Sequence, residues 1–154
     1  MLIVTMIING FLYNKFVCII PKEKLENKFR IIFVGDSITE GTGTSKKSKS
    51  YPLLLKSILK QKYPKVDIIK NGAGWRTAQK HGDRPCVKDL DCLELSILQE
   101  PDVIVLMFGS NDSKNYQWME EAFEEDYYEL CTNFRRSPTH PLVYLVIPPP
   151  LYIN

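Results

Sequence analysis

Four short runs of apolar, mostly β-branched residues constrain the fold of this chain more than any other feature of its sequence. They occupy residues 30–34, 66–69, 102–108 and 142–147. Continuous apolar runs of this length are typical of strands that are buried on both faces of a sheet. Such strands occur mainly in parallel sheets that are covered by helices on both sides.

Segments whose apolar residues have helical spacing separate these runs. Helices are expected over residues 51–63, 89–99 and 119–136, and Pro52 lies in the first turn of the first one, where proline is tolerated. The third begins with acidic residues and ends in two arginines, as the helix dipole favours. The apolar positions that predict the buried faces are, in chain order, Leu54, Leu55, Ile58 and Leu59; Leu90, Leu93, Ile97 and Leu98; and Met119, Ala122, Phe123, Tyr127, Leu130 and Phe134.

The alternation of strand and helix predicts an α/β fold with three αβα layers around a doubly wound, flavodoxin-like parallel sheet. The 154 residues suffice for one domain, which we assign to residues 29–154. Residues 1–28 are an apolar N-terminal segment and a charged linker. The first charge of that segment, Lys15, lies inside the apolar run rather than before it. Two interpretations therefore stay open: a signal or anchor segment, and an extra strand or a piece of an upstream domain.

The charge and the cysteines exclude several classes of protein. Lysine and arginine number 20 against 18 aspartates and glutamates, and this balance argues against a nucleic-acid partner. Four cysteines are too few for a disulfide scaffold. Cys86 and Cys92 are spaced so that they can pair if the protein is secreted, and beside His81 they can also be imagined as metal ligands. Their spacing fits no closed zinc site, so we predict no metal. Cys131 falls on the apolar face of the third helix and is expected in the core.

The sequence also predicts no cofactor. Residues 41–48 (GTGTSKKS) look like a phosphate loop, but no glycine directly precedes a Lys-Ser pair. Gly41 and Gly43 lack the third glycine of a dinucleotide-binding fingerprint, where Lys46 stands instead. The Gly-x-Ser-x-Gly elbow of α/β-hydrolases is absent because Thr39 replaces its final glycine.

Glycine combined with small polar residues follows three of the predicted strands. The sequence reads Gly-Asp-Ser after the first strand, Asn-Gly-Ala-Gly after the second and Gly-Ser-Asn-Asp after the third. Ligands of such sheets bind beyond the carboxyl ends of the strands, so the fold brings all three loops to one rim. The residue types at this rim suggest acyl transfer.

Each of these residues has an expected role in that chemistry. Ser37 is the candidate nucleophile, presented on the turn between strand and helix. A tetrahedral oxyanion needs preorganised donors, which the backbone N–H groups of Ser37 and Gly72 and the side-chain amide of Asn111 can supply. Gly72 carries no Cβ and lets the backbone approach the substrate. Asp36 and Asp112 are expected to support the loops by hydrogen bonding to backbone N–H groups.

These residues resemble the SGNH, or GDSL-type, serine hydrolases. Residues 35–41 (GDSITEG) are similar to the family's first block, which carries the nucleophile, and residues 109–112 (GSND) to the block whose asparagine completes the oxyanion hole. The resemblance covers about residues 28–153 and implies an ester hydrolase. The stretches that look more narrowly like the sialate O-acetylesterase-like branch are 77–85 (TAQKHGDRP), 111–114 (NDSK) and 147–150 (IPPP).

The second block departs from the family pattern Asn-x-Gly-x-x-Gly-x-Thr. With Thr77 as its last residue, Gly72 is the oxyanion glycine, a lysine replaces the asparagine, and Trp75 replaces the second glycine. Anchoring on Asn71 instead would put Ala73 in the key place. We prefer Thr77, because residues 77–85 then align without a gap. Trp75 is in that case expected to alter the rim of the pocket.

The family's catalytic histidine and aspartate lie in a final Asp-x-x-His-Pro block after a fifth strand. This sequence ends at Asn154, beyond its fourth strand. The resemblance therefore implies a domain that is incomplete at its C-terminus and lacks the last strand and helix. It also implies that the fourth strand is an exposed, aggregation-prone edge.

Two histidines occur in the sequence. His140 is followed by Pro141, but Ser137 stands where the aspartate belongs, and His140 precedes the fourth strand, so it is expected opposite the site. His81, in a loop after the second strand, is a candidate substitute base.

Two functions follow from these observations. The first is a serine ester hydrolase of the carbohydrate O-acetylesterase type, acting through an acyl-enzyme on Ser37 with a base beyond Asn154. The second is a catalytically dead protein of the same fold that binds a carbohydrate or acyl ligand. Both have a small-molecule or carbohydrate ester as partner, and neither needs a membrane apart from the N-terminal segment. The sequence leaves a secreted and a cytoplasmic location open.

Overall fold

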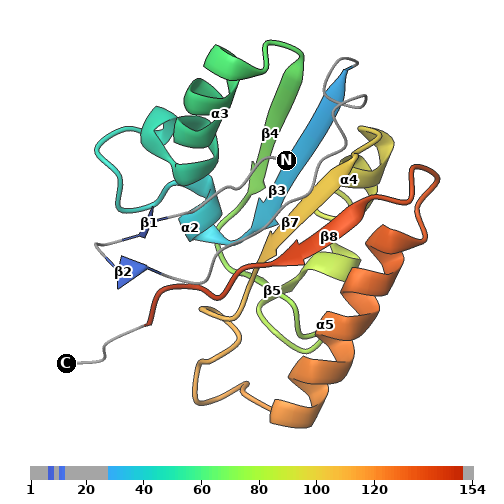
Figure 1. Cartoon of the computed structure of the whole chain (residues 1–154). Coiled ribbons are helices and arrows are strands. Elements are labelled where there is room, and N and C mark those ends of the chain that lie inside the picture. Colours follow the sequence, from blue (N-terminus) through green and yellow to red (C-terminus); the bar gives the residue numbers. More distant parts are fainter. Residues whose placement is uncertain (1–6, 9–10, 13–27, 151–154) are drawn as a thin grey trace.

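A computed structural model describes residues 7–8, 11–12 and 28–150 of the chain (Figure 1). Its centre is a sheet of four parallel strands in the order β4-β3-β7-β8. The strands are β3 (Phe29–Gly35), β4 (Val66–Gly72), β7 (Val103–Met107) and β8 (Leu142–Leu145). The four expected strands and their parallel pairing are confirmed, and only their ends differ from the prediction.

Helices on both sides of the sheet complete three layers, as the sequence predicts. α3 (Tyr51–Lys62) packs on one face, while α4 (Glu94–Leu98) and α5 (Glu120–Arg135) pack on the other (Figure 1). The one-turn helix α2 (Ser37–Glu40) follows β3 directly. The shorter elements are β1 (Ile7–Ile8), β2 (Phe11–Leu12), η1 (Lys47–Lys49), β5 (Arg76–Thr77), β6 (Arg84–Pro85) and η2 (Cys86–Lys88).

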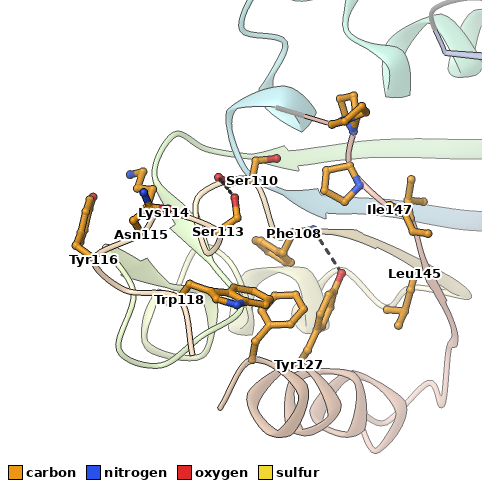
Figure 2. A pocket seen from close by; sticks show the side chains of 16 residues that line it. Phe108, Ser110, Ser113, Lys114, Asn115, Tyr116, Trp118, Tyr127, Leu145 and Ile147 are labelled. Carbon is orange, nitrogen blue, oxygen red and sulfur yellow. Dashed lines mark hydrogen bonds between the residues drawn. The ribbon is translucent and has the colours of Figure 1, made fainter. Parts of the chain in front are cut away.

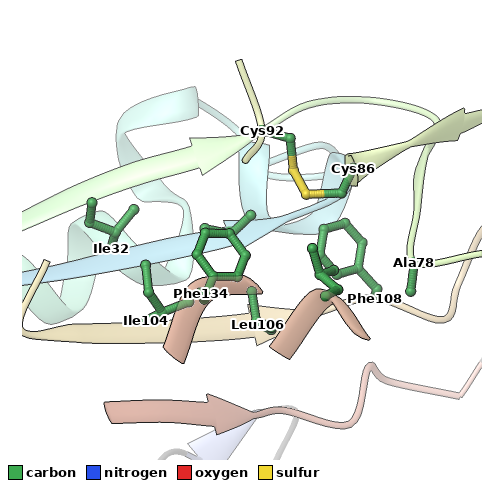
Figure 3. Close-up of a cluster of buried hydrophobic side chains, with 10 residues drawn as sticks. Ile32, Ala78, Cys86, Cys92, Ile104, Leu106, Phe108 and Phe134 are labelled. Carbon is green, nitrogen blue, oxygen red and sulfur yellow. A yellow bond between two sulfur atoms is a disulfide. The ribbon is translucent and has the colours of Figure 1, made fainter. Parts of the chain in front are cut away.

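The side chains of β3 alternate between two hydrophobic clusters, one on each face of the sheet. Ile32 and Val34 belong to a cluster that also contains Phe134 of α5, and Figure 3 shows Ile32 and Phe134 within it. Ile31 and Phe33 point the other way and pack with residues of α3. This period of two explains why the run reads as continuously apolar, since both faces of β3 are covered. Each of these buried side chains contributes about 1.5–3 kcal/mol to folding.

The buried face of α3 is narrower than predicted. Leu59 is buried and Leu55 partly so, but Leu54 and Ile58, expected on the same face, are 50% and 63% exposed. Successive residues of a helix are rotated by about 100° around its axis. When Leu55 and Leu59 face the sheet, the residues that precede them, Leu54 and Ile58, therefore point away from it.

The predicted second helix, over residues 89–99, is wrong over its first half. A disulfide joins Cys86 to Cys92, and turns occupy the segment between η2 and α4. The side chains of Leu90 and Leu98, expected on the buried face, are 64% and 72% exposed. The covalent link and local turns therefore override the helical spacing of the leucines in this segment.

The third helix matches its prediction to within one residue at each end. Leu130 and Phe134 are fully buried, whereas Met119 precedes the helix and is 56% exposed, contrary to the expectation that it faces the core. Cys131 is half-buried, packs against the cluster of α5 and is a free thiol.

β8 lies at one edge of the four-stranded sheet, and its apolar side chains are only partly covered. Leu142 and Leu145 are 50% and 49% exposed. This agrees with the exposed edge that the sequence implies for the fourth strand.

The N-terminal segment falls mostly outside the described residues. Its two described pieces, β1 and β2, pair as antiparallel strands. Cys18 and the choice between signal, anchor and strand lie outside the described residues. Within the part of the chain that the structure describes, no helix combines the length and apolar character needed to cross a membrane.

Candidate active site

Ser37 is the first residue of α2, on the turn that follows β3. Asp36 precedes it as the N-cap, and its Oδ1 accepts a hydrogen bond of 2.8 Å from the backbone N–H of Ile38. The Asp36 side chain is buried, whereas Ser37 is only half-buried. The turn therefore fixes the serine at the carboxyl edge of the sheet and leaves it partly accessible.

Two glycines allow α2 to lie directly against the strand ends. A Cβ on Gly35 would lie 2.2 Å from Oγ1 of Thr39 and 2.6 Å from the backbone oxygen of Met107. A Cβ on Gly72 would lie 2.2 Å from the backbone nitrogen of Glu40. Backbone atoms cannot swing aside as a flexible side chain can, so both positions require glycine. Gly72, expected as an oxyanion donor, thus also has a packing reason to be glycine.

The loop after β4 is tied to the nucleophile turn by two backbone donors. The N–H of Ala73 donates to the backbone oxygen of Gly35 at 3.2 Å, and the N–H of Gly74 donates to Oε2 of Glu40 at 3.2 Å. These bonds make the first two loops a single unit at the edge of the sheet.

Trp75 has a backbone conformation that favours glycine. Its φ of 68° lies in the left-handed region, which costs a side-chain-bearing residue about 1–2 kcal/mol. This is the position where the alignment on Thr77 places the second glycine of the family pattern. The indole is 65% exposed, and Nζ of Lys114 lies 4.3 Å from its ring centroid. Trp75 is therefore exposed beside Lys114, and its expected effect on the rim of the pocket stays a prediction.

Asp112 joins the loop after β7 to the chain around β5. Its Oδ1 accepts from the N–H groups of Ala78 at 2.9 Å and Gln79 at 2.8 Å, and its Oδ2 accepts from the N–H of Gly109 at 3.1 Å. Burial raises the pKa of the Asp112 carboxyl, and these N–H donors oppose that shift. Because its three partners are donors, the geometry selects the ionised carboxylate.

Asn111, the expected oxyanion residue, is held beside Asp112. Its side-chain Nδ2 donates to the backbone oxygen of Arg76 at 3.0 Å, and its own backbone oxygen accepts from Nε2 of Gln117 at 2.5 Å. An amide NH₂ carries two donor hydrogens, so the bond to Arg76 fixes the orientation of the group and leaves the second hydrogen for another acceptor.

Asp36 in the first loop and Ser110 in the third each carry a buried side-chain oxygen. Within the described residues, Oδ2 of Asp36 and Oγ of Ser110 are both buried without a hydrogen-bond partner. Burial raises the pKa of Asp36, while the N–H of Ile38 and the hydroxyl of Ser110 act in the opposite direction.

The three loops therefore meet at one edge of the sheet. Bonds to Gly35 and Glu40 join the first loop to the second, and bonds of Asp112 and Asn111 join the third loop to residues 76–79. Asp36 and Asp112 make the kind of contact expected of residues that support loops. The assignment of Ser37 as nucleophile and of Ser37, Gly72 and Asn111 as oxyanion donors stays a prediction.

A cavity of about 930 Å³ lies beside the third loop, and Gly109, Ser110 and Ser113 form part of its wall (Figure 2). Aromatic and aliphatic side chains dominate its wall, including Phe108, Trp118, Phe123, Tyr127, Leu145 and Ile147. Ser37, Gly72 and Asn111 do not line it. The cavity is consequently a neighbour of the nucleophile turn rather than the pocket around it.

The structure does not identify either histidine as the base for Ser37. His140 lies between α5 and β8, at the amino end of that strand, and its Nδ1 lies 3.2 Å from the backbone oxygen of Arg135. This is the end of the sheet opposite to Ser37, as the sequence predicts. His81 is exposed in the loop between β5 and β6, and its role as a substitute base stays a prediction. No cluster of three or more metal-binding side chains occurs within the residues that the structure describes.

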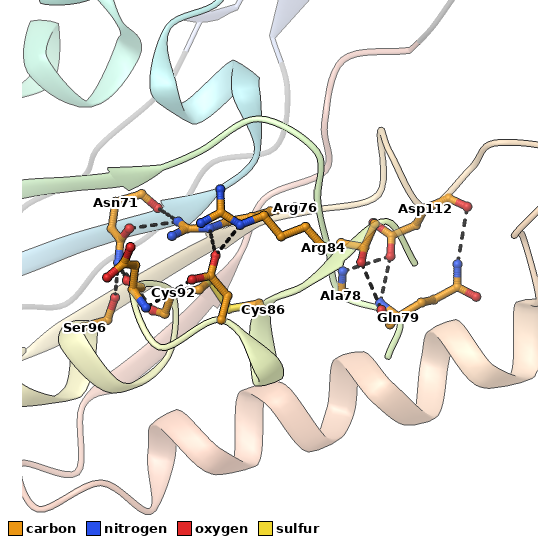
Figure 4. The surroundings of a disulfide bond; sticks show 12 residues. Asn71, Arg76, Ala78, Gln79, Arg84, Cys86, Cys92, Ser96 and Asp112 are labelled. Atoms are coloured by element: carbon orange, nitrogen blue, oxygen red, sulfur yellow. Dashed lines mark hydrogen bonds and ion pairs between the residues drawn. A yellow bond between two sulfur atoms is a disulfide. The ribbon is translucent and has the colours of Figure 1, made fainter. Parts of the chain in front are cut away.

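The sequence did not predict a buried polar network that joins the second loop to residues 76 and 89. Its centre is Arg76, which is 1% exposed and pairs with Asp89 at 2.9 Å (Figure 4). A single arginine among polar residues is normally expected to be exposed to solvent, so no local sequence pattern predicts that Arg76 is buried. The one available signal is the short spacing of Cys86 and Cys92, which flank Asp89.

A family model, the GDSL-like lipase/acylhydrolase family, matches residues 33–154. The chain belongs to this family. A curated relative, an acetylxylan esterase from Xylanibacter ruminicola, is 33% identical over 125 residues, which cover 79% of this chain and 25% of that protein. The narrower likeness to sialate O-acetylesterases stays a prediction.

Solved structures of esterases share the fold. A two-domain esterase active on acetylated mannans is 28% identical, with a TM-score of 0.62, over 80% of this chain and 31% of that one. A carbohydrate acetylesterase family member from Sinorhizobium meliloti has a TM-score of 0.60 at 24% identity, over 80% of this chain and 64% of that one. The chain thus spans about a quarter of the acetylxylan esterase and about a third of the mannan esterase.

Proposed function

We propose that this domain is the nucleophile-bearing part of a serine esterase that removes acetyl groups from carbohydrates. The observation that carries the proposal is the joining of three loops, with Ser37, Gly72 and Asn111 among them, at the carboxyl edge of one parallel sheet. Membership of the GDSL-like family supports ester hydrolysis, and the relatives named for acetylated xylan and mannan support a carbohydrate substrate.

The proposed reaction runs in two steps. Oγ of Ser37 attacks the acetyl carbonyl carbon while a general base takes its proton, and N–H donors of Ser37, Gly72 and Asn111 bind the oxyanion. The C–O bond to the sugar then breaks, and the sugar oxygen takes up the proton. Water attacks the acetyl-enzyme in the same way, and acetate leaves. We propose that the base comes from a segment other than the described residues, because His140 lies at the opposite end of the sheet and His81 is exposed in the loop between β5 and β6.

The rim around Trp75 supports a sugar as the group that leaves. Trp75 and Tyr116 are 65% and 73% exposed, and the ammonium of Lys114 lies near both rings. Asp83 accepts a hydrogen bond from Lys114 and forms an ion pair with it. Exposed aromatic rings beside polar groups offer both an apolar surface and hydrogen-bonding partners, which is what a sugar ring requires.

The test is an esterase assay on the natural protein, including any segment that follows Asn154. The protein is expected to hydrolyse 4-nitrophenyl acetate and to release acetate from acetylated xylo- or manno-oligosaccharides. Ser37→Ala is expected to abolish both activities, whereas Ser45→Ala, in an exposed loop, retains them. Undiminished turnover by Ser37→Ala would refute the proposal.

A second candidate function is a binding protein that lacks the base. The position of His140 and the exposure of His81 favour it. This function predicts that the protein binds acetylated oligosaccharides in calorimetry without releasing acetate. Measurable acetate release that depends on Ser37 excludes it.

We also propose that the protein is located outside the cytoplasm. Cys86 and Cys92 form a buried disulfide, and disulfides persist mainly in oxidising compartments. Titration of free thiols in protein isolated under non-reducing, thiol-blocking conditions tests this, since a reduced pair would support a cytoplasmic location.

A further inference from the structure

Arg76 is a buried residue whose guanidinium has partners in the second loop and in the segment 86–92. Its Nε donates to Oδ2 of Asp89 at 2.9 Å, and its Nη1 donates to the backbone oxygen and Oδ1 of Asn71 at 2.9 and 2.8 Å. Figure 4 shows these bonds beside the disulfide. A guanidinium held by three directed bonds has little freedom to move.

The partners of Arg76 are themselves fixed by the loop that the disulfide closes. Asp89 lies between Cys86 and Cys92 and also pairs with Nε of Arg84 at 2.8 Å. Nδ2 of Asn71 donates to the backbone oxygen of Asp91, in the same loop, at 2.6 Å. The loop of residues 86–92, which we call the disulfide loop, therefore holds Arg76 through two separate residues.

Arg76 in turn contacts the candidate oxyanion residue. The backbone oxygen of Arg76 accepts the hydrogen bond from Nδ2 of Asn111. A rotation or shift of Arg76 would move this acceptor and change the direction of the second amide hydrogen of Asn111. A change of this kind in a preorganised donor affects the transition state more than the bound substrate.

We infer that the disulfide loop is a positioning device for the Asn111 amide, acting through Asp89 and Arg76. The inference rests on the proposed function, in which that amide binds the oxyanion. Asp89 and Arg76 are positioning residues, because they act on the reaction only through Asn111.

A direct test observes the side-chain amide of Asn111 by NMR in protein labelled with ¹⁵N, with Asn111→Ala used to assign the signal. Asp89→Asn is expected to shift this signal, because Arg76 loses its charged partner. Asp91→Asn is the matched control: it makes the same change of charge in the same loop, but Asp91 takes part in the network only through its backbone N–H and oxygen, and not through its side chain. An unshifted Asn111 signal in folded Asp89→Asn overturns the inference.

Two further variants keep the inference testable if Asp89→Asn does not fold. Arg84 has a partly exposed side chain, and Arg84→Gln removes one of the two guanidiniums that hold Asp89. The double variant Cys86→Ala/Cys92→Ala removes the covalent closure, with Cys131→Ala as its control for the loss of a cysteine. Both are expected to shift the Asn111 signal, and an unchanged signal in folded Arg84→Gln overturns the inference.

Binding of phenylboronic acid separates this inference from the proposed function. Oγ of Ser37 adds to boron, which becomes tetrahedral and negative while the serine proton passes to solvent, so the adduct imitates the oxyanion. Ser37→Ala and Asn111→Ala are expected to weaken binding, and Asp89→Asn to weaken it about tenfold by misdirecting one donor. If Asn111→Ala binds as the wild type does, the proposed function fails, whereas the NMR shift still decides the inference. If only Asp89→Asn binds normally, the inference fails and the function stands.

Discussion

The polar network around Arg76 and Asp112 and the apolar cavity beside β8 flank the same loop, but they are built differently. In the network, buried charged groups have directed partners at 2.8–3.1 Å. Around the cavity, rings meet edge to face or tilted, and Trp118 and Ile147 remain 43% and 71% exposed. One region is closed and fixed, and the other is open.

The difference shows which kind of contact can position a donor. A carboxylate that accepts three N–H bonds fixes both distance and direction, and an error leaves buried groups unpaired. Apolar contacts are non-directional and tolerate changes of shape more easily. The polar side is therefore suited to hold Asn111, while the apolar side contributes surface. Four predictions test this contrast, from the largest expected effect to the smallest.

Asp112→Ala should be the most destabilising of these changes. It removes the acceptor of three backbone N–H groups, two of them fully buried, and we expect a loss of about 4 kcal/mol in the free energy of unfolding. Urea denaturation followed by circular dichroism measures the loss. The exposed Asp91→Ala should change stability by no more than about 0.5 kcal/mol. A loss below about 1 kcal/mol for Asp112→Ala would mean that the network does not fix the loops.

Asp89→Asn should cost about 2 kcal/mol at neutral pH, because Arg76 loses a charged acceptor. Although burial opposes the shift, the guanidiniums of Arg76 and Arg84 lower the pKa of Asp89 below its ordinary value of 3.8. A carboxyl with a lowered pKa adds stability above that ordinary value and loses it as the pH falls through the lowered one.

The stability gap between wild type and Asp89→Asn should therefore be constant above about pH 5 and should close as the pH falls below about 4. Urea midpoints over this pH range provide the measurement. A gap that widens on acidification would contradict the lowered pKa of Asp89.

The third prediction concerns backbone strain at Trp75. Glycine adopts a φ of 68° freely, whereas alanine does not. Trp75→Gly should therefore be more stable than Trp75→Ala by about 1 kcal/mol in thermal or urea unfolding. Since both variants lose the same indole, the comparison isolates the backbone, and equal stabilities would exclude strain at this residue.

Trp118→Ala should have the smallest effect, about 0.5 kcal/mol on the free energy of unfolding. The ring lies 5.0 Å from that of Phe123, centroid to centroid, and much of it already contacts solvent. Phe123→Ala provides the comparison and should cost more, because that ring is half-buried and also contacts Tyr127. A larger loss for Trp118→Ala than for Phe123→Ala would mean that the cavity wall is as rigid as the polar network.

The sequence predicted the strands and helices correctly where their apolar residues form an uninterrupted run or a regular spacing. The four strands were predicted from continuous apolar runs and the third helix from the helical spacing of its apolar residues. Each occurs close to its predicted place. The second helix was wrong only over its first half. Leu90, Leu93 and Ile97 have helical spacing, but a disulfide and turns occupy residues 86–93. Spacing alone does not tell which apolar residues face a sheet, as the exposed Leu54 and Ile58 demonstrate.

The sequence by itself determined the order of strands and helices and the three loops that carry glycine, serine and asparagine, because these are local patterns with a local physical cause. Only the tertiary structure decided how those loops are held. Asp112 meets Ala78 and Gln79 across more than 30 residues, and Arg76 meets Asp89 through a loop closed by a disulfide. Contacts between distant residues depend on how the layers pack, and no short stretch of sequence contains that information.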